Sequence, residues 1–338
     1  MERKRILITG GCGFIGSNFI QKILQEEEAV EVFNLDKLTY ASNIENLETV
    51  SSLCNYNFVE GDICDQNLVK EVLFKNQINF LINFAAESHV DNSIANPNDF
   101  INTNINGTFN LLNCSLRYVN ENNKLTFLHV STDEVYGSLE LGEKPFSESN
   151  KIEPNSPYSA SKASSDMLVR AWNKTYNLPI LITNCSNNFG PFQHFEKFIP
   201  SIIKSALNHD EIKIYGDGKN IRDWIFVEDH CDALMSIIEK GIIGETYNIG
   251  ADNEYSNLEI ANKVCSLLER KKPISKNKFL GKITSYKDLI KFVKDRPGHD
   301  FRYGIDSQKI KSLTGWFPKT SFDYGLEKTV DWYIKQYS

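Results

Sequence analysis

Thr9-Gly10-Gly11-Cys12-Gly13-Phe14-Ile15-Gly16 is the stretch that decides the fold of this 338-residue chain. It follows a run of mainly apolar residues at 5–9 and opens a helical pattern at 14–27, so the order is strand, glycine loop, helix. The spacing Gly-x-x-Gly-x-x-Gly lets the backbone turn tightly, and the free N–H groups at the start of the helix favour a pyrophosphate. The stretch therefore predicts the first strand and helix of a dinucleotide-binding, Rossmann-type fold.

The same alternation continues through the first half of the chain. Short β-branched runs lie at 5–9, 30–35, 56–60, 80–84, 125–131 and 180–183, and helical patterns lie at 14–27, 67–75, 98–118 and 158–176. Strands that alternate with helices in this way form a parallel sheet that is covered on both faces. The predicted fold class is therefore α/β, with a Rossmann-type doubly wound parallel sheet.

The composition of the sequence changes after residue 187. Turn-rich stretches such as Tyr215-Gly216-Asp217-Gly218-Lys219-Asn220 appear, with aromatic and basic residues around them. We expect residues 1–186 to form the dinucleotide-binding domain, with 221–251 rejoining it. Residues 187–338 are expected to form mainly a smaller, partly interleaved lobe that binds the substrate. The strand-like run at 245–250 is expected to join the main sheet.

Composition and charge limit the possible partners. The chain is 41% hydrophobic and 24% charged, as soluble globular proteins are, and its net charge of -7 disfavours nucleic acid. We expect no membrane partner and a cytoplasmic location, because no apolar run approaches the roughly 18 residues of a membrane span or the length of a signal peptide. The seven cysteines lack CxxC spacing, so we expect buried free thiols and no metal site.

Acidic and small residues at the ends of the next strands favour one cofactor. Asp36 closes the second strand, 20 residues after Gly16. A carboxylate there accepts hydrogen bonds from both ribose hydroxyls and repels a 2′-phosphate, so NAD is favoured over NADP. Asp62 ends the third strand, where it either caps the adenine or is an ordinary turn residue. The small residues Ala85 and Ala86 end the fourth strand and leave room for a ribose.

Two pairs of side chains carry the predicted chemistry. Tyr158 and Lys162 stand four residues apart at a helix start, and the ammonium is expected to lower the pKa of the phenol so that it acts as a base. Asp133 and Glu134 follow Thr132 at the end of the fifth strand. Adjacent carboxylates beside a hydride site indicate a second proton transfer, which points to a dehydratase rather than a simple dehydrogenase. A polar strand end is the alternative explanation.

These elements resemble those of the extended short-chain dehydrogenases/reductases, and specifically the nucleoside-diphosphate-glucose 4,6-dehydratases of the dTDP-glucose type. The resemblance covers nearly the whole chain and is carried by residues 9–16, 36–41, 85–91, 131–137, 158–162, 186–191, 216–224 and 295–300. Thr132-Asp133-Glu134 and Arg296-Pro297-Gly298-His299-Asp300 are the specific motifs. The whole superfamily shares the glycine loop and the Tyr/Lys pair.

The resemblance implies a reaction that converts dTDP-glucose to the 4-keto-6-deoxy sugar and water. Tyr158 would remove the C4 hydroxyl proton while Thr132 hydrogen-bonds the same oxygen, and the C4 hydride would pass to NAD⁺. Glu134 would then remove the C5 proton, and protonated Asp133 would release the C6 hydroxyl as water. The hydride would return to C6 of the same molecule, and Glu134 would reprotonate C5.

The motifs also define the expected contacts. The predicted cofactor contacts are Gly10, Gly13, Phe14, Ile15, Gly16, Asp36, Lys37, Leu38, Thr39, Asp62, Ile63, Phe84, Ala85, Ala86, Ser88, Thr103, Tyr158, Lys162 and Asn188. The predicted contacts to the nucleotide sugar are Ser88, Thr132, Asn187, Lys197, Arg222, Asn257, Arg296 and His299. Arg222, Arg296 and His299 would supply the cations for the diphosphate. The long helices at 98–118 and 158–176 would pair across a homodimer.

Two departures from the family pattern leave the nucleotide base open between thymine, uracil and others. Asn184 stands where the family typically carries arginine, and His194-Phe195 replaces a proline-containing pair. A UDP-sugar 4-epimerase shares the fold and the Tyr/Lys pair but typically has small or hydroxyl residues in place of Asp133 and Glu134. A 4,6-dehydratase of UDP-glucose and a dinucleotide-sensing regulatory protein are further alternatives, and the fold alone does not decide between them.

Overall fold

A computed structural model describes residues 3–276 and 283–337 of the chain. Its main element is a seven-stranded sheet in the order β10-β6-β5-β4-β1-β2-β3, in which every neighbouring pair is parallel. The strands are β1 (Lys4–Thr9), β2 (Val30–Asp36), β3 (Tyr56–Glu60), β4 (Phe80–Asn83), β5 (Thr126–Thr132), β6 (Ile180–Cys185) and β10 (Thr246–Ile249). Each predicted strand is present within two residues of its expected ends, and the run at 245–250 forms β10 beside β6.

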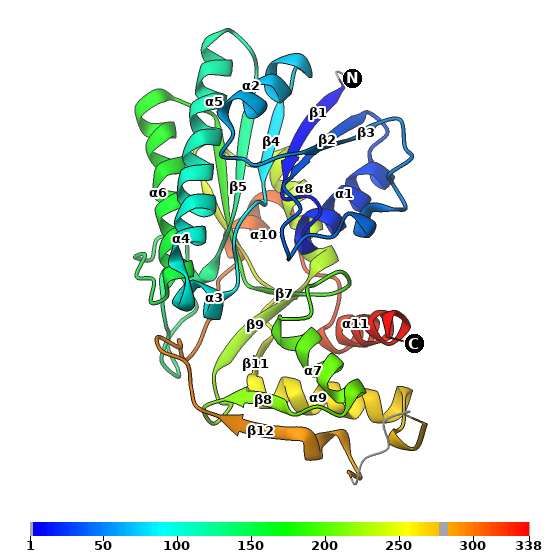
Figure 1. Ribbon diagram of the computed structural model, residues 1–338. Helices are drawn as coiled ribbons and strands as arrows, with labels where there is room; N and C mark the ends of the chain where they lie inside the picture. Colours follow the sequence, from blue (N-terminus) through cyan, green and yellow to red (C-terminus); the bar gives the residue numbers. More distant parts are fainter. Residues whose placement is uncertain (1–2, 277–282, 338) are drawn as a thin grey trace.

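Helices cover both faces of this sheet (Figure 1). The helices of one face are α1 (Phe14–Glu26), α8 (Val227–Lys240) and α10 (Gln308–Thr314), and those of the other are α2 (Gln66–Lys75), α5 (Thr108–Asn120) and α6 (Pro157–Tyr176). In β1, Ile6 and Ile8 lie in the core beneath α1 and α8, whereas Leu7 lies in the core beneath α2 and α5. Strands that are apolar on both faces are typical of a buried parallel sheet. The predicted fold class is confirmed.

The predicted helix at 98–118 is divided in the structure. A short helix, α4 (Pro97–Phe100), leads into a wide π-helical turn at Ile101–Gly107 and only then into α5. Within this turn, the Asn104 side chain accepts a hydrogen bond from the Glu87 N–H at 2.9 Å and donates one to the Glu87 carbonyl at 3.0 Å. The carbonyl of Asn104 accepts a bond from Ser165 at 2.6 Å. The widened turn therefore fixes the loop that follows β4.

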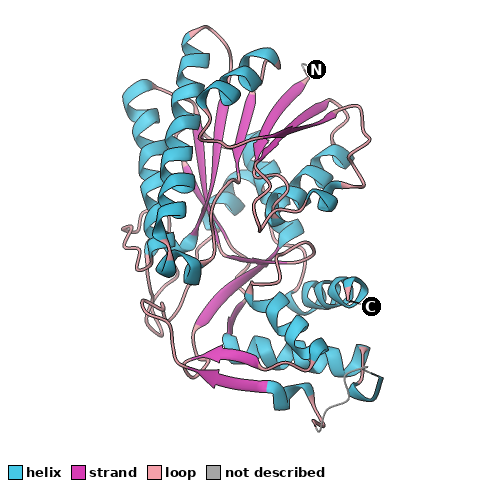
Figure 2. Cartoon of the chain, in the orientation of Figure 1, coloured by secondary structure: helices cyan, strands magenta, loops and turns pink. Residues whose placement is uncertain are grey.

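A second, smaller lobe lies below the sheet in the orientation of Figures 1 and 2. Its strands are β7 (Asn187–Phe189), β9 (Ile221–Phe226) and β11 (Glu254–Ser256), in the order β11-β9-β7, and the paired β8 (Ile212–Tyr215) and β12 (Ile290–Val293). Its helices are α7 (Phe198–Asn208), α9 (Asn257–Lys271) and α11 (Phe322–Gln336). No helix within residues 3–276 and 283–337 has the apolar length required to cross a membrane.

Strand β9 joins the two lobes. Trp224 and Phe226 lie in the core of the smaller lobe, whereas Ile225 between them lies in the core of the main sheet. The segment 221–251 is therefore divided: α8 and β10 belong to the main sheet, but β9 pairs with β7 and β11 because its aromatic side chains fill the smaller core. Helix α10, which falls within the segment predicted to form the second lobe, packs against α8 and β10 instead.

Candidate active site

The loop between β1 and α1 is shaped by its glycines. Gly10 has a φ of +70°, and a Cβ there would lie 2.6 Å from the backbone nitrogen of Ala85. A Cβ on Gly16 would lie 2.5 Å from the carbonyl oxygen of Gly10. For Gly13, a Cβ would meet the same oxygen at 3.2 Å, which is a tight approach but a milder one than at the other two glycines. Two glycines thus pack the loop against the protein, and the third lets a pyrophosphate approach the N-terminus of α1.

This loop is one wall of a cavity of ≈ 290 Å³. The predicted cofactor contacts that line it are Gly10, Gly13, Phe14, Ile15, Gly16, Asp36, Lys37, Thr39, Asp62, Ile63, Phe84, Ala85, Ala86, Ser88, Thr103, Tyr158, Lys162 and Asn188. Leu38 does not line it. Its side chain packs against the core beneath α1, and its N–H donates to Asp36 at 2.9 Å, so Leu38 holds a carboxylate of the wall instead.

Two carboxylates of this wall are held by backbone N–H groups. One oxygen of Asp36 accepts from Cys12 and the other from Leu38, each at 2.9 Å. The remaining lone pairs of this buried carboxylate fit the two hydroxyls of a ribose. Asp62 accepts from the Cys64 N–H at 2.9 Å, as a turn residue does, and also pairs with the Lys37 ammonium at 3.3 Å. Asp62 is therefore a turn residue that also lies in the wall of the cavity.

Helix α6 presents the Tyr/Lys pair from its first turns. The helix begins after Ser156, whose hydroxyl accepts from the Ser159 N–H at 3.0 Å in a reciprocal capping box. Tyr158 and Lys162 follow on one face and line the cavity. The Lys162 ammonium donates to the carbonyl oxygen of Val130 in β5 at 2.9 Å. The pair is therefore held against the strand that carries the acidic residues.

The electrostatics of this pair differ from the prediction. Burial raises the pKa of Tyr158 well above its ordinary value, the Glu134 carboxylate raises it further, and the Thr132 hydroxyl opposes the shift. Burial lowers the pKa of Lys162. The expected lowering of the phenol pKa is therefore wrong for the protein alone, because burial and the charge of Glu134 raise this pKa.

The acid pair lies where β5 passes into a single 3₁₀ turn at Asp133–Tyr136. Thr132 caps this turn, because its hydroxyl oxygen accepts from the Glu134 N–H at 3.2 Å. Asp133 is buried, and among the described residues its Oδ2 has no hydrogen-bond partner. Burial raises the pKa of Asp133 well above its ordinary range, and the charges of Glu134 and Asp223 add to this shift. Burial thus favours the neutral acid form of Asp133, and one of its oxygens has no partner among the described residues.

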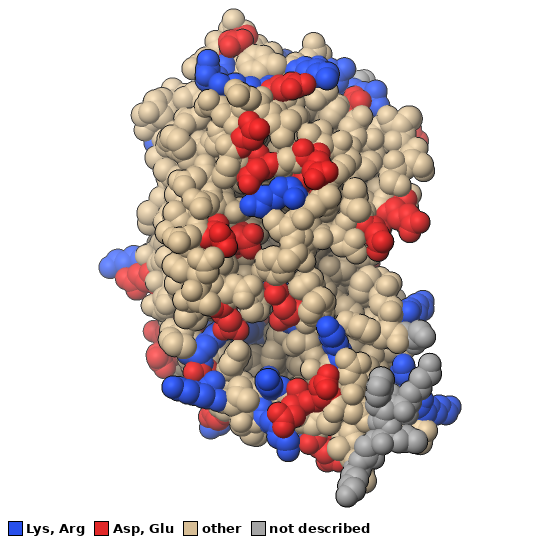
Figure 3. Space-filling view, viewed as in Figure 1, with Lys and Arg blue, Asp and Glu red and all other residues tan. Residues whose placement is uncertain are grey.

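A second cavity, of ≈ 710 Å³, opens between the lobes. Figure 3 shows the hollow between the lobes, with lysine and arginine side chains at its edge. The predicted substrate contacts that line this cavity are Ser88, Asn187, Lys197, Arg222, Asn257, Arg296 and His299. Thr132 lines only the first cavity, and Glu134, Ser88, Asn187 and Lys197 line both. Glu134 therefore stands at the junction of the two cavities, beside Asp133. Burial raises the pKa of Glu134, against the opposing charges of Arg296 and Arg222.

The predicted cations of this cavity are not equivalent. Arg222 is buried and donates to the carbonyl oxygens of Ile221 at 2.7 Å and Asp300 at 2.9 Å. Arg296 has a buried Nε without a hydrogen-bond partner among the described residues. His299 contacts Asp295 at 2.6 Å, but burial and the Arg296 charge lower the pKa of its imidazole to about 4. The imidazole of His299 is therefore neutral near pH 7 in the protein without substrate, and its role as a cation for the diphosphate stays a prediction.

Sequence reasoning missed Tyr303 and Asp223. The Tyr303 hydroxyl donates to Asp300 at 2.5 Å and lies 3.5 Å from Glu134 Oε2, and its ring lies 4.1 Å below the Arg222 guanidinium. Asp223 is buried, and its pKa is raised to about 6 by burial. Both follow recognised motif residues closely in the sequence, Tyr303 three positions after Asp300 and Asp223 next to Arg222, which is the signal that could have found them.

Comparisons with known proteins agree with this geometry. A family model described as GDP-mannose 4,6 dehydratase matches residues 7–329. The dTDP-glucose 4,6-dehydratase of Haemophilus influenzae is 48% identical over 334 residues, which cover 97% of this chain and 97% of that protein.

Solved structures show the same agreement. A dTDP-glucose 4,6-dehydratase of Streptomyces venezuelae, with NAD and a dTDP ligand bound, matches with a TM-score of 0.89 and 40% identity over 98% of this chain and 97% of that one. A UDP-glucose 4-epimerase of Thermotoga maritima matches with a TM-score of 0.85 and 26% identity over 99% of this chain and 100% of that one. The chain therefore belongs to the family described as GDP-mannose 4,6 dehydratase, and its full-length relatives include dTDP-glucose 4,6-dehydratases.

Proposed function

We infer that this chain is an NAD-dependent dTDP-glucose 4,6-dehydratase, a hydro-lyase that forms the 4-keto-6-deoxy sugar and water. One observation carries this conclusion. A buried carboxyl that favours its neutral form, Asp133, stands beside a second carboxyl, Glu134, where the cofactor cavity meets the substrate cavity. The activity named for the relatives of Haemophilus influenzae and Streptomyces venezuelae supports the same conclusion.

NAD fits the first cavity. The backbone at Gly13, which carries no side chain, and the start of α1 suit its pyrophosphate, and the lone pairs of Asp36 suit its adenosine ribose. When bound, NAD⁺ supplies a group that accepts the C4 hydride of the sugar and gives it back to C6. Tyr158, Lys162 and Thr132 line the end of the cavity nearest the acid pair and would face the reacting sugar.

The first proton transfer belongs to Tyr158. Its phenolate would take the proton of the C4 hydroxyl, and the Thr132 hydroxyl would hydrogen-bond the same oxygen. The Lys162 ammonium, fixed on Val130, and the positive charge of the oxidised cofactor would lower the pKa of the phenol once the site is filled. The raised pKa of Tyr158 in the protein alone keeps the phenol protonated until then.

Removal of water from C5 and C6 belongs to the acid pair. Glu134 would take the C5 proton, which the new 4-keto group makes acidic, and would later return a proton to C5. Asp133 would donate its proton to the C6 hydroxyl, and its free Oδ2 is available for that bond. The reaction requires Asp133 with its proton and Glu134 without one. The stronger upward pKa shift of Asp133 fits this assignment.

The diphosphate would lie in the second cavity against Arg222 and Arg296. The unpartnered Nε of Arg296 is a donor that awaits an acceptor. His299 would enter as a neutral imidazole and gain a proton as the diphosphate binds, because a nearby anion raises the pKa of an imidazole. Asn187, whose buried Oδ1 has no partner among the described residues, would face the junction.

A UDP-sugar 4-epimerase is the alternative with the same fold. Its reaction exchanges hydrogen at C4 alone, so it has no step for a neutral Asp133 beside Glu134. A dehydratase that prefers UDP-glucose differs only at the nucleotide base. Incubation with dTDP-glucose, UDP-glucose and CDP-glucose tests these alternatives, and we expect the 4-keto-6-deoxy product to form fastest from dTDP-glucose.

Deuterium at C4 of the substrate gives the sharper test. In a dehydratase the label moves to the C6 methyl of the same molecule, without net accumulation of NADH. Label that returns to C4 while C6 keeps its hydroxyl would contradict the proposal in favour of an epimerase, and label released on NADH would indicate a simple dehydrogenase. Tyr158→Phe should prevent label transfer, because the C4 oxygen then keeps its proton.

We also propose that two copies of the chain form a homodimer through α5 and α6. These helices lie side by side in Figure 1, and the same flank shows few charged side chains in Figure 3. Ile101, Phe109 and Met167 on this flank are 46%, 45% and 53% exposed, and a second copy would cover them. Sedimentation should give a dimer, and Phe109→Glu with Met167→Glu should give monomers. An unchanged mass would contradict this interface.

The redox state of the thiols supports a cellular location. All seven cysteines are free, and five of them are buried. Free thiols are kept in a reducing compartment. We therefore propose a cytoplasmic location, which cell fractionation would test.

A further inference from the structure

A buried polar layer crosses the main sheet on the face that α5 and α6 cover. Thr9 of β1, Asn83 of β4 and His129 of β5 are partners in register across three neighbouring strands. The Thr9 hydroxyl donates to Asn83 at 2.6 Å, and Asn83 Nδ2 lies 3.2 Å from His129 Nδ1. Because Asn83 donates here, His129 carries its proton on Nε2, which points toward α6.

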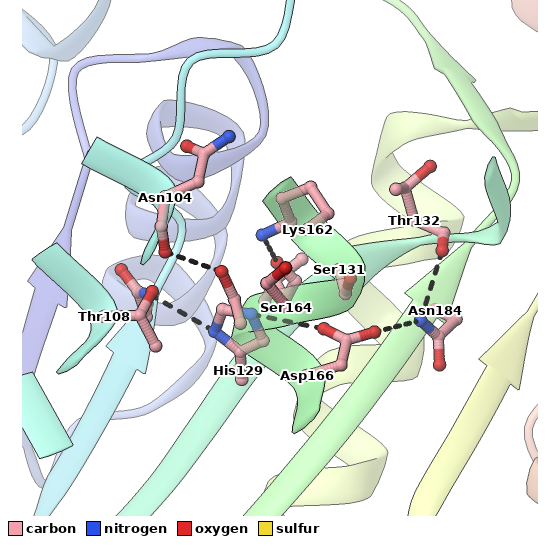
Figure 4. A network of polar contacts seen from close by, with 12 residues as sticks. Asn104, Thr108, His129, Ser131, Thr132, Lys162, Ser164, Asp166 and Asn184 are labelled. Carbon is pink, nitrogen blue, oxygen red and sulfur yellow. Dashed lines mark hydrogen bonds and ion pairs between the residues drawn. The ribbon is translucent and has the colours of Figure 1, made fainter. Parts of the chain in front are cut away.

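Asp166 of α6 continues this layer toward the catalytic strand. His129 Nε2 lies 3.4 Å from one carboxylate oxygen of Asp166, and the Asn184 amide of β6 donates to the other at 3.1 Å. The same amide donates to the backbone carbonyl of Thr132 at 3.1 Å. Figure 4 shows Asp166 between His129 and Asn184, with Thr132 beyond. One side-chain amide thus ties α6 to the last residue of β5, directly before the acid pair.

Asp166 also stands one helical turn after Lys162. Both residues are buried, and no lysine or arginine within the described part of the chain pairs with the Asp166 carboxylate. Burial lowers the pKa of Lys162, and the negative charge of Asp166 opposes this shift. The other titratable groups around the ammonium are Tyr158 on α6, Cys185 on β6 and His129 on β5. Asp166 is thus the carboxylate whose charge opposes the lowering of the Lys162 pKa, from one helical turn away.

We propose that Asp166 and Asn184 are positioning residues for the dehydration, an inference that rests on the proposed function. Asn184 fixes the carbonyl of Thr132 and with it the point from which Asp133 and Glu134 project. Asp166 holds the Asn184 amide and places a carboxylate one helical turn from the Lys162 ammonium. The two residues therefore connect α6, which carries Tyr158, to the end of β5, which carries the acid pair. Neither residue would contact the sugar.

The test compares the holoenzyme with three variants and a matched control. The variants are Asp166→Asn, Asp166→Glu and Asn184→Ala. The control is Asp229→Asn on α8, another buried aspartate, whose carboxylate accepts from two backbone N–H groups at 3.0 and 2.9 Å and which lines neither cavity. For each protein, kcat and KM for dTDP-glucose are measured against pH, and NAD affinity is measured by fluorescence titration.

Asp166→Asn should lower kcat by about tenfold or more, with KM and NAD affinity changed by about twofold at most. It should also move the alkaline limb of kcat to lower pH, because Lys162 without its counter-charge loses its proton earlier. Asp166→Glu should restore the alkaline limb of kcat to its wild-type pH. Asn184→Ala should lower kcat but leave the pH of this limb unchanged, since the charge of Asp166 remains. The control should change neither quantity.

Several results would overturn this inference. A wild-type alkaline limb in Asp166→Asn would show that the carboxylate does not set the charge of Lys162, and an equal loss of kcat in the control would show a general effect of buried aspartates. If Asp166→Asn does not fold, wild-type kcat in Asn184→Ala would refute the coupling. A wild-type protein that forms no 4-keto product contradicts the proposed function itself, whereas an active wild type with unaffected variants contradicts only this inference.

Discussion

The ammonium of Lys197 donates to the backbone carbonyl of Ser88 at 2.6 Å and lies 3.1 Å from the Ser88 hydroxyl. Lys197 caps the start of α7 in the smaller lobe, whereas Ser88 belongs to the loop after β4 in the larger one. Both residues line both cavities, so this contact lies where the cofactor cavity meets the substrate cavity. It joins the lobes at the junction where we propose that the sugar lies.

Lys197→Met should therefore raise KM for the nucleotide sugar. The ammonium also lines the substrate cavity as a predicted contact, and loss of a hydrogen bond from a charged group to the substrate costs about 1.5–3 kcal/mol, which corresponds to roughly ten- to hundredfold in KM. Steady-state kinetics check this result. Lys204→Met is the matched control on the same helix, because the Lys204 ammonium lies 3.7 Å over the Phe195 ring and does not line the substrate cavity. Equal effects of both substitutions would contradict the assignment.

Asp133→Asn and Glu134→Gln should each lower kcat by roughly 10²–10⁴-fold, the usual contribution of a positioned acid or base. NAD affinity should stay nearly unchanged, because the glycine loop and Asp36 are untouched. Glu134→Gln should also suppress incorporation of solvent deuterium at C5 of the sugar, measured by mass spectrometry. Normal turnover with normal C5 labelling would show that Glu134 is only a polar strand end.

Two glycine substitutions should separate cofactor binding from folding. Gly13→Ala places its Cβ in a tight contact, 3.2 Å from the carbonyl oxygen of Gly10, but at an ordinary φ of -75°, so it should weaken NAD binding and lower the thermal stability of the apoprotein less than Gly10→Ala does. Gly10→Ala places its Cβ 2.6 Å from Ala85 at a φ of +70°, so it should lower that stability as well. Calorimetry and NAD titration measure the two effects. Similar losses of stability in both variants would contradict this division.

Asp36 should select NAD over NADP. A 2′-phosphate would meet a carboxylate that two backbone N–H groups hold in place, so its repulsion is not relieved by rotation of the side chain. Titration of the apoprotein with each dinucleotide should show tighter binding of NAD, and Asp36→Ser should narrow the difference. Equal or tighter binding of NADP by the wild type would refute the role assigned to Asp36.

Buried histidines should make the fold sensitive to mild acid. Burial lowers the pKa of His129 to about 4 and that of His230 to about 3, whereas an unfolded histidine titrates near 6.5. Below about pH 6.5 the unfolded chain therefore binds protons that the folded protein does not, and the free energy of unfolding falls by up to about 1.4 kcal/mol per pH unit for each histidine.

Denaturant unfolding of the apoprotein between pH 7 and 5 measures this slope. His230→Asn should reduce the change in the free energy of unfolding per pH unit by the contribution of one histidine, because the variant lacks this imidazole. The carboxylates contribute equally in both proteins. Parallel curves for wild type and variant would contradict the neutral state assigned to His230.

The main sheet and most of the cofactor site could be predicted from the sequence, since both depend on local patterns. Apolar runs locate the strands, and parallel strands bring their carboxyl ends, including Asp36 and Asp62, to one edge. Features that depend on distant packing were not visible. The neutral state of His299 follows from burial beside Arg296, and the wide turn around Asn104 follows from its bonds to Glu87, which lies 17 residues away in sequence.

The membership of β9 shows the same limit. Its sequence ends in the apolar run Trp224-Ile225-Phe226, and only the surrounding tertiary structure sends Trp224 and Phe226 to one core and Ile225 to the other. Tyr303 was likewise invisible as a neighbour of Glu134, because 169 residues separate them in sequence.

The division of β9, α8 and β10 between two cores has a consequence for any shortened version of this protein. A fragment that stops at residue 186 would hold the glycine loop, Asp36 and all five predicted catalytic residues, yet it would lose α8 and α10 from one face of the sheet and β10 from its edge. The unpaired backbone N–H and C=O groups of β6 and the exposed apolar face beside α1 would then promote aggregation of the fragment. The cofactor-binding and substrate-binding lobes are therefore not expected to fold as separate fragments, since each lobe completes the hydrophobic core of the other.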